Sequence, residues 1–75
     1  MASLRHELAE WFGRAVIVAR GADAELLGAE RALAAGDARV ARRHARDLLS
    51  RVPRSPIGLR LAADAAEAAW LDDEA

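Results

Sequence analysis

The chain has 75 residues, no cysteine and a net charge of −1, and alanine supplies half of the 53% of residues that count as hydrophobic. A chain of this length forms one domain at most. The absence of cysteine excludes disulfides and thiolate metal sites and makes a reducing compartment the expected one. The longest apolar run, residues 15–19, is far shorter than the roughly 20 residues of a membrane span, and Glu7 and Glu10 are wrong for a secretory signal. We therefore expect a cytoplasmic protein without a membrane partner.

Start and stop signals divide the chain into four helices. The predicted helices cover residues 3–20, 24–35, 38–51 and 56–71. The expected capping residues are Ser3, Asp23, Asp37 and Ser55, and the expected stops are Gly21, Gly36 and Pro53. Connections of roughly two to four residues make consecutive helices antiparallel neighbours. The predicted fold class is all-α, with four antiparallel helices in consecutive α-hairpins within a single domain, residues 1–75.

Apolar residues at helical spacing define the faces that we expect to be buried in the first three helices. On the first helix they are Leu4, Leu8, Trp11, Phe12, Ala15, Val18 and Ala19, with His6, Glu10 and Arg14 opposite. On the second they are Leu26, Ala29 and Leu33, and on the third Ala38, Ala41, Ala45, Leu48, Leu49 and Val52. Trp11 and Trp70 are expected to be core anchors.

The fourth helix is apolar on two sides. One side carries Leu59, Ala62, Ala63, Ala66 and Trp70, and we expect it to face helix 38–51. The other side carries Ile57, Leu61, Ala65 and Ala68. No remaining helix is evidently able to cover this second strip, so it is the candidate self-association site. The simplest product is a two-fold homodimer of the isolated chain.

Helix 38–51 and its flanks carry the most informative pattern. Gly36-Asp37, Ala41, Ala45, Leu48-Leu49 and Pro53 form a helix stop, a helix start, a small-residue stripe and a second stop. This order resembles the second half of a tetratricopeptide repeat (TPR). Continuing the register places Leu59, Ala62, Ala63 and Ala66 on the W-x2-L-G-x2-Y positions of the family, and the resemblance covers roughly residues 22–71.

The resemblance implies a short α-solenoid segment that binds another protein or protein segment as a scaffold. It implies no catalytic activity and no cofactor. Stable arrays of this kind usually contain about three repeats. The chain would then be the N-terminal fragment of a longer array, or a small protein that completes itself by forming a homo-oligomer.

Charge is strongly segregated along the chain. Residues 39–60 carry seven arginines and one aspartate, whereas residues 61–75 carry five acids and no basic residue. All eleven basic residues are arginine, which we attribute to a GC-rich, bacterial-type composition. The partner-binding candidates are Arg39, Arg42, Arg43 and Arg46, opposite the apolar stripe of helix 38–51.

Two interpretations of these four arginines stay open: a solvated face, or a site for an acidic partner. A nucleic-acid backbone is the weaker alternative partner. No aromatic residue is interleaved for base stacking, and the net charge is slightly negative.

Residues able to do chemistry are few. The only hydroxyl side chains are Ser3, Ser50 and Ser55, so there is no nucleophile–base set and we predict that the chain is not an enzyme. The pairs His6/Glu10 and His44/Asp47 supply two ligands each, fewer than a zinc site needs, so no metal is expected. We expect His44 to lie at the boundary of its helix stripe and Glu30 to be a rim carboxylate paired with an arginine.

Overall fold

The structure is a computed structural model that describes the backbone of residues 2–74 and the side chains of residues 7–71. Its four helices are α1 (Ala2–Ala19), α2 (Asp23–Ala34), α3 (Ala38–Arg51) and α4 (Pro56–Glu74), and no strand occurs among the described residues. The predicted all-α class is confirmed. The helix bounds agree with the predicted ones to within one residue, except that α4 continues to Glu74.

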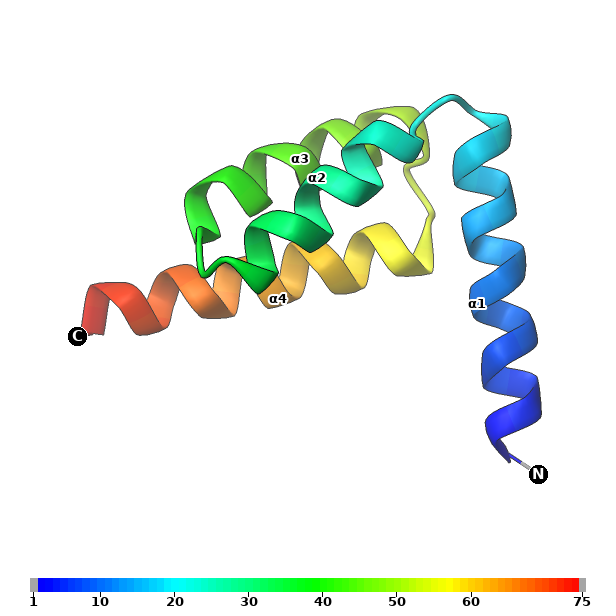
Figure 1. Cartoon of the computed structure of the whole chain (residues 1–75), viewed down its shortest axis with the longest axis horizontal. Coiled ribbons are helices and arrows are strands. Elements are labelled where there is room, and N and C mark those ends of the chain that lie inside the picture. Colours follow the sequence, from blue (N-terminus) through cyan, green and yellow to red (C-terminus); the bar gives the residue numbers. More distant parts are fainter. Residues whose placement is uncertain (1, 75) are drawn as a thin grey trace.

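Three of the helices form the body of the molecule, and α1 lies across one end of it (Figure 1). α3 packs extensively against α2 and against α4, and α4 also contacts α2. α1 contacts α2 and α4 over a much shorter stretch, and its N-terminal half projects away from the body (Figure 1). The α2–α3–α4 body therefore carries most of the packing.

The turn between α2 and α3 is formed by Gly36 and Asp37. Gly36 has a φ of 77°, which favours glycine, and the Asp37 amide donates to the Ala32 carbonyl at 2.8 Å. The Asp37 carboxylate in turn accepts a hydrogen bond from the Val40 amide at 3.2 Å. One residue thus closes α2 and caps α3. Gly21, with a φ of 70°, makes the corresponding turn after α1.

Two of the four predicted caps are confirmed. Besides Asp37, the buried Ser55 hydroxyl accepts a hydrogen bond from the Gly58 amide at 3.0 Å and caps α4. Asp23 is not a cap, because it is the first residue of α2. Its negative charge at this position still stabilises the helix by interacting with the helix dipole. Ser3 lies inside α1 rather than before it, and its side chain is outside the described residues.

The core is small and rich in alanine. Its main cluster consists of Ile17, Ala22, Leu26, Ala29, Ala45, Leu48, Val52, Ile57 and Leu61. A second cluster consists of Ala32, Ala41 and Ala65. The predicted inward faces of α2 and α3 are confirmed, because their central positions, such as Leu26, Ala41 and Ala45, are buried. The small side chains allow the helices to approach closely.

At Gly28, the absence of a side chain lets α2 approach α3 closely. A Cβ added at Gly28 would lie 2.7–2.8 Å from three ring atoms of His44. Gly28→Ala has two opposing effects on stability. Overpacking against His44 costs ~1–3 kcal/mol, whereas alanine stabilises a helix by ~1 kcal/mol relative to glycine. The net result should be a loss of stability of about 1 kcal/mol. In a His44→Ala background the same substitution should raise stability. Urea unfolding of the four proteins checks this, and the same sign in both backgrounds would contradict it.

α4 packs with the face opposite to the predicted one. Ile57, Leu61 and Ala65 are buried and Ala68 is half-buried. The expectation that Ile57, Leu61, Ala65 and Ala68 form an uncovered self-association strip is therefore wrong. The physical reason is that α4 contacts both α2 and α3 with this strip, and its two large side chains, Ile57 and Leu61, are part of the main core cluster. Leu59 and Trp70, expected to face α3, are exposed instead.

α1 is also turned away from its predicted orientation. Ile17 joins the main core cluster, whereas Trp11 and Phe12 on the predicted stripe are exposed. Trp11 and Trp70 are therefore surface residues, and their prediction as core anchors is wrong. Leu4, on the same stripe, lies outside the described side chains.

Candidate interaction surfaces

The arginines of α3 form one exposed face. Arg39, Arg42, Arg43 and Arg46 are all exposed, as their predicted position opposite the apolar stripe requires. Among the residues with described side chains, none of the four makes an ion pair or a side-chain hydrogen bond. Arg14, Arg51 and Arg60 differ, since each bonds to an oxygen elsewhere in the chain. The charge of the α3 face is therefore not compensated by local pairing.

A shallow groove of about 270 Å³ runs beside this face, between α3 and α4. Its lining residues are Arg42, Arg46, Leu49, Ala62 and Ala66. One wall is thus cationic and the rest is apolar. The exposed side chains of Leu59 and Trp70 belong to the same outward side of α4 as Ala66, and they extend the apolar surface beyond the groove.

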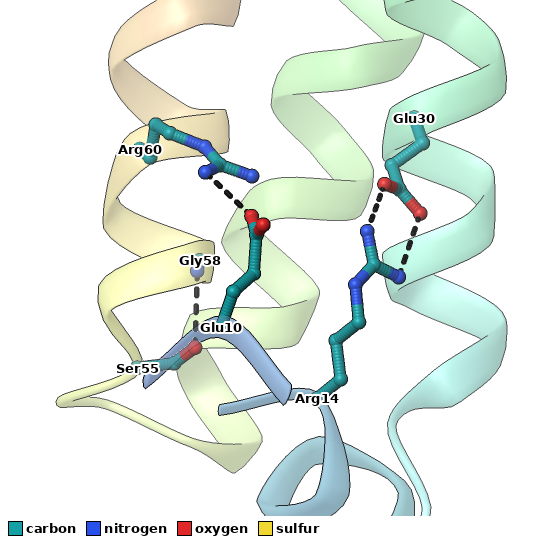
Figure 2. A network of polar contacts seen from close by, with 6 residues as sticks. All are labelled: Glu10, Arg14, Glu30, Ser55, Gly58 and Arg60. Atoms are coloured by element: carbon teal, nitrogen blue, oxygen red, sulfur yellow. Dashed lines mark hydrogen bonds and ion pairs between the residues drawn. The ribbon is translucent and has the colours of Figure 1, made fainter. Parts of the chain in front are cut away.

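Two ion pairs hold α1 to the body, and they start from adjacent turns of the helix (Figure 2). Arg60 of α4 donates to Glu10 at 2.7 Å, and Arg14 donates to Glu30 of α2 at 2.6 Å. The hydrogen bond to Glu30 raises the pKa of Arg14 above its ordinary value, because the carboxylate stabilises the charged guanidinium. The prediction that Glu30 is a rim carboxylate paired with an arginine is confirmed.

A second hollow, about 250 Å³ in volume, lies at this junction. It is lined by Ala9, Glu10, Gly13, Pro56, Ile57 and Arg60. A Cβ added at Gly13 would lie 3.0 Å from Ile57 Cδ1, so the two helices cross closely here. The charged groups of the hollow, Glu10 and Arg60, are already paired with each other. Among its described lining residues the hollow therefore has no unpaired charged group with which to select a ligand, and we assign it to the packing of α1.

His44 is half-buried, as expected for a residue at the boundary of the α3 stripe, and its ring lies against Gly28 of α2. Its Nδ1 is 3.7 Å from Glu25 Oε2, too far for a hydrogen bond. Within the described part of the chain, no group of three or more His, Cys, Asp or Glu residues could hold a metal ion. The His6 of the other considered pair lies outside the described side chains.

Comparisons of this chain with models of protein families, with curated proteins and with solved structures find no match. Across the described helices, none combines the length and the apolar character needed to cross a membrane. The functional interpretation therefore depends on the α3–α4 groove and the arginines beside it.

Proposed function

We propose that this protein is a non-enzymatic protein–protein interaction module of helical-repeat type, similar to a tetratricopeptide repeat. Its partner is an acidic, amphipathic segment of another protein, which lies along the groove between α3 and α4. The observation that carries this proposal is the position of uncompensated arginines beside an apolar groove. The alternative of a solvated arginine face accounts for the charge but not for the apolar surface next to it.

The two parts of this surface contribute differently to binding. Exposed ion pairs contribute only about 0–1 kcal/mol each, so the arginines mainly supply selectivity and association rate. Apolar area contributes roughly 25 cal/mol per Å², so the groove and the exposed Leu59 and Trp70 supply most of the affinity. Arginine suits the rim because its aliphatic stem packs on apolar surface while its guanidinium binds a carboxylate.

The repeat resemblance supports the same conclusion. α2, α3 and α4 follow one another with the short turns and mutual contacts that a helical-repeat unit has. In the register of the resemblance, Leu59, Ala62, Ala63 and Ala66 lie on the α4 positions of the family pattern; Ala62 is half-buried, and the other three are exposed instead of packed on α3 as expected. Exposed apolar positions of this kind are suited to receiving another helix.

The test uses a fluorescently labelled helical peptide with glutamates on one side and leucines on the other. The wild-type chain should bind it with an affinity that falls as salt concentration rises. Replacing Arg39, Arg42, Arg43 and Arg46 together by glutamine should weaken binding by about tenfold or more, ~1.4 kcal/mol, and should remove most of the salt dependence. Fluorescence anisotropy at several salt concentrations measures both effects.

A matched control removes exposed arginines elsewhere. Arg20, Arg31 and Arg54 are exposed and make no described ion pair, so their replacement by glutamine should change peptide affinity little. Equal losses in the two variants would contradict a specific site on α3. Binding of labelled DNA or RNA, but not of the peptide, would replace this proposal with the nucleic-acid alternative.

A further inference from the structure

α1 turns an uninterrupted apolar face away from the body. The side chains of Leu8, Trp11, Phe12 and Val18 are each between 59% and 68% exposed. Two charged side chains of the same helix, Glu10 and Arg14, reach inward to α4 and α2 (Figure 2), and the exposed Glu7 lies at the edge of the face, one turn before Trp11. The outward face therefore combines two aromatic and two aliphatic side chains without a charge among them.

This orientation is unfavourable for a chain that remains alone in water. This orientation is held by the buried side chain of Ile17, by the close Gly13–Ile57 contact and by the two ion pairs described above, which are partly exposed and contribute about 0–1 kcal/mol each. Leaving a large apolar side chain fully in water forgoes about 1.5–3 kcal/mol, and α1 leaves roughly two thirds of each of four such side chains exposed. The balance favours a state in which another surface covers this face.

The spacing of the face indicates what kind of surface covers it. Leu8, Trp11, Ala15 and Val18 are separated by three, four and three residues, which is the seam spacing of helices that pack alongside one another. Phe12 lies next to this seam and widens it. A helix that runs along α1 fits the seam better than a loop or a strand edge.

We propose that the occupant is α1 of a second copy of this chain, in a two-fold homodimer. The four large side chains expose on the order of 500 Å² in each chain, so their complete mutual burial would remove about 1,000 Å², which is the lower limit for a specific interface before the flanking residues are added. Because the seam carries no charge, a two-fold axis brings no like charges together within it. The projecting half of α1 also leaves room for a second body (Figure 1).

The charges beside the seam argue against a membrane as the occupant. Helices that lie on anionic membranes carry an excess of lysine and arginine, whereas in α1 Glu7 and Glu10 balance Arg5 and Arg14. The proposed dimer uses a different surface from the α3–α4 groove. The dimer and the proposed function can therefore be tested independently, and either can be contradicted without affecting the other.

Analytical ultracentrifugation of the whole chain tests the dimer. The wild type should be dimeric in the micromolar range, and Trp11→Glu should raise the dissociation constant at least about thirtyfold, as loss of a hot-spot tryptophan does. Trp70→Glu is the matched control, because Trp70 is 61% exposed but lies on α4, and it should leave the dimer intact. A wild-type chain that is monomeric at high micromolar concentration would overturn the proposal, as would a dimer that Trp70→Glu dissociates and Trp11→Glu does not.

Tryptophan emission gives a second measurement that does not require a destabilising substitution. In a Trp70→Phe variant Trp11 is the only tryptophan, and its emission should move to shorter wavelength as rising concentration buries it in the dimer. In a Trp70→Phe/Val18→Glu variant the emission should not depend on concentration. A concentration-independent emission in the first variant would overturn the proposal, and so would a monomer that binds neutral or anionic phospholipid vesicles through Trp11.

Discussion

Leu48→Ala should lower the free energy of unfolding by about 2–5 kcal/mol, the range found when a buried leucine is truncated and leaves a cavity. Leu48 is completely buried and, with Ile17, is one of the two largest fully buried side chains among those described. Small domains have only about 5–15 kcal/mol of stability, so the variant should be close to unfolding at room temperature. Urea unfolding followed by circular dichroism measures the loss.

Leu27→Ala provides the control for this substitution. Leu27 is a leucine on α2 that lies outside both proposed binding surfaces and is exposed. Its truncation should change stability by no more than about 0.5 kcal/mol, as is usual for surface positions. Similar losses at Leu27 and Leu48 would contradict the assignment of Leu48 to the main core cluster.

Ala45→Leu should destabilise the protein by about 1–3 kcal/mol, because the contact around Ala45 has no space for three further carbon atoms. Ala45 is completely buried and belongs to the main core cluster between the helices. In a domain of this size each kcal/mol corresponds to a change of roughly 4–8 °C in the melting temperature. Thermal unfolding should therefore show a clear decrease.

Arg43→Ala, on the opposite side of α3, should leave the melting temperature almost unchanged. Arg43 is exposed and makes no described ion pair, so its truncation removes no packing and no polar partner. If Ala45→Leu and Arg43→Ala had equal effects, the orientation of α3 about its axis would be wrong.

Local signals in the sequence were sufficient to place the helices. Gly36 and Asp37 act through their own backbone conformation and through a cap within three residues, so no distant part of the chain is needed to interpret them. The inward face of α3 was also predictable, because its apolar residues occupy a single side while arginines occupy the other. Both kinds of signal are complete within one helix and its flanks.

The inward faces of α1 and α4 could not be determined in this way. α4 is apolar on two sides, and helical periodicity cannot say whether the side with Leu61 or the side with Leu59 meets the body. For α1 the periodicity indicated the wrong side, because the contact with the body depends on Gly13, on Ile17 and on ion pairs to residues far along the chain.

For the candidate sites as well, features that depend on one helix were predictable, and features that depend on how helices pack were not. The exposed position of the arginine face followed from α3 alone. The groove beside it required α4 to be placed against α3, and the pairing of Glu10 with Arg60 joins residues 50 positions apart. The rim position of Glu30 predicted that its partner would be an arginine. It did not predict which arginine, and the structure identifies Arg14.

The close contacts at the glycines and alanines determine which changes this fold tolerates during evolution. At Gly13, Gly28 and Gly58 an added methyl group would come within 2.7–3.0 Å of a neighbouring side chain. Several large side chains, among them Trp11 and Trp70, are in contrast open to solvent and free to vary as far as the monomer is concerned. Selection for this architecture therefore acts most strongly on its smallest residues, and a divergent relative is better sought by the spacing of its glycines and alanines than by its large hydrophobic residues.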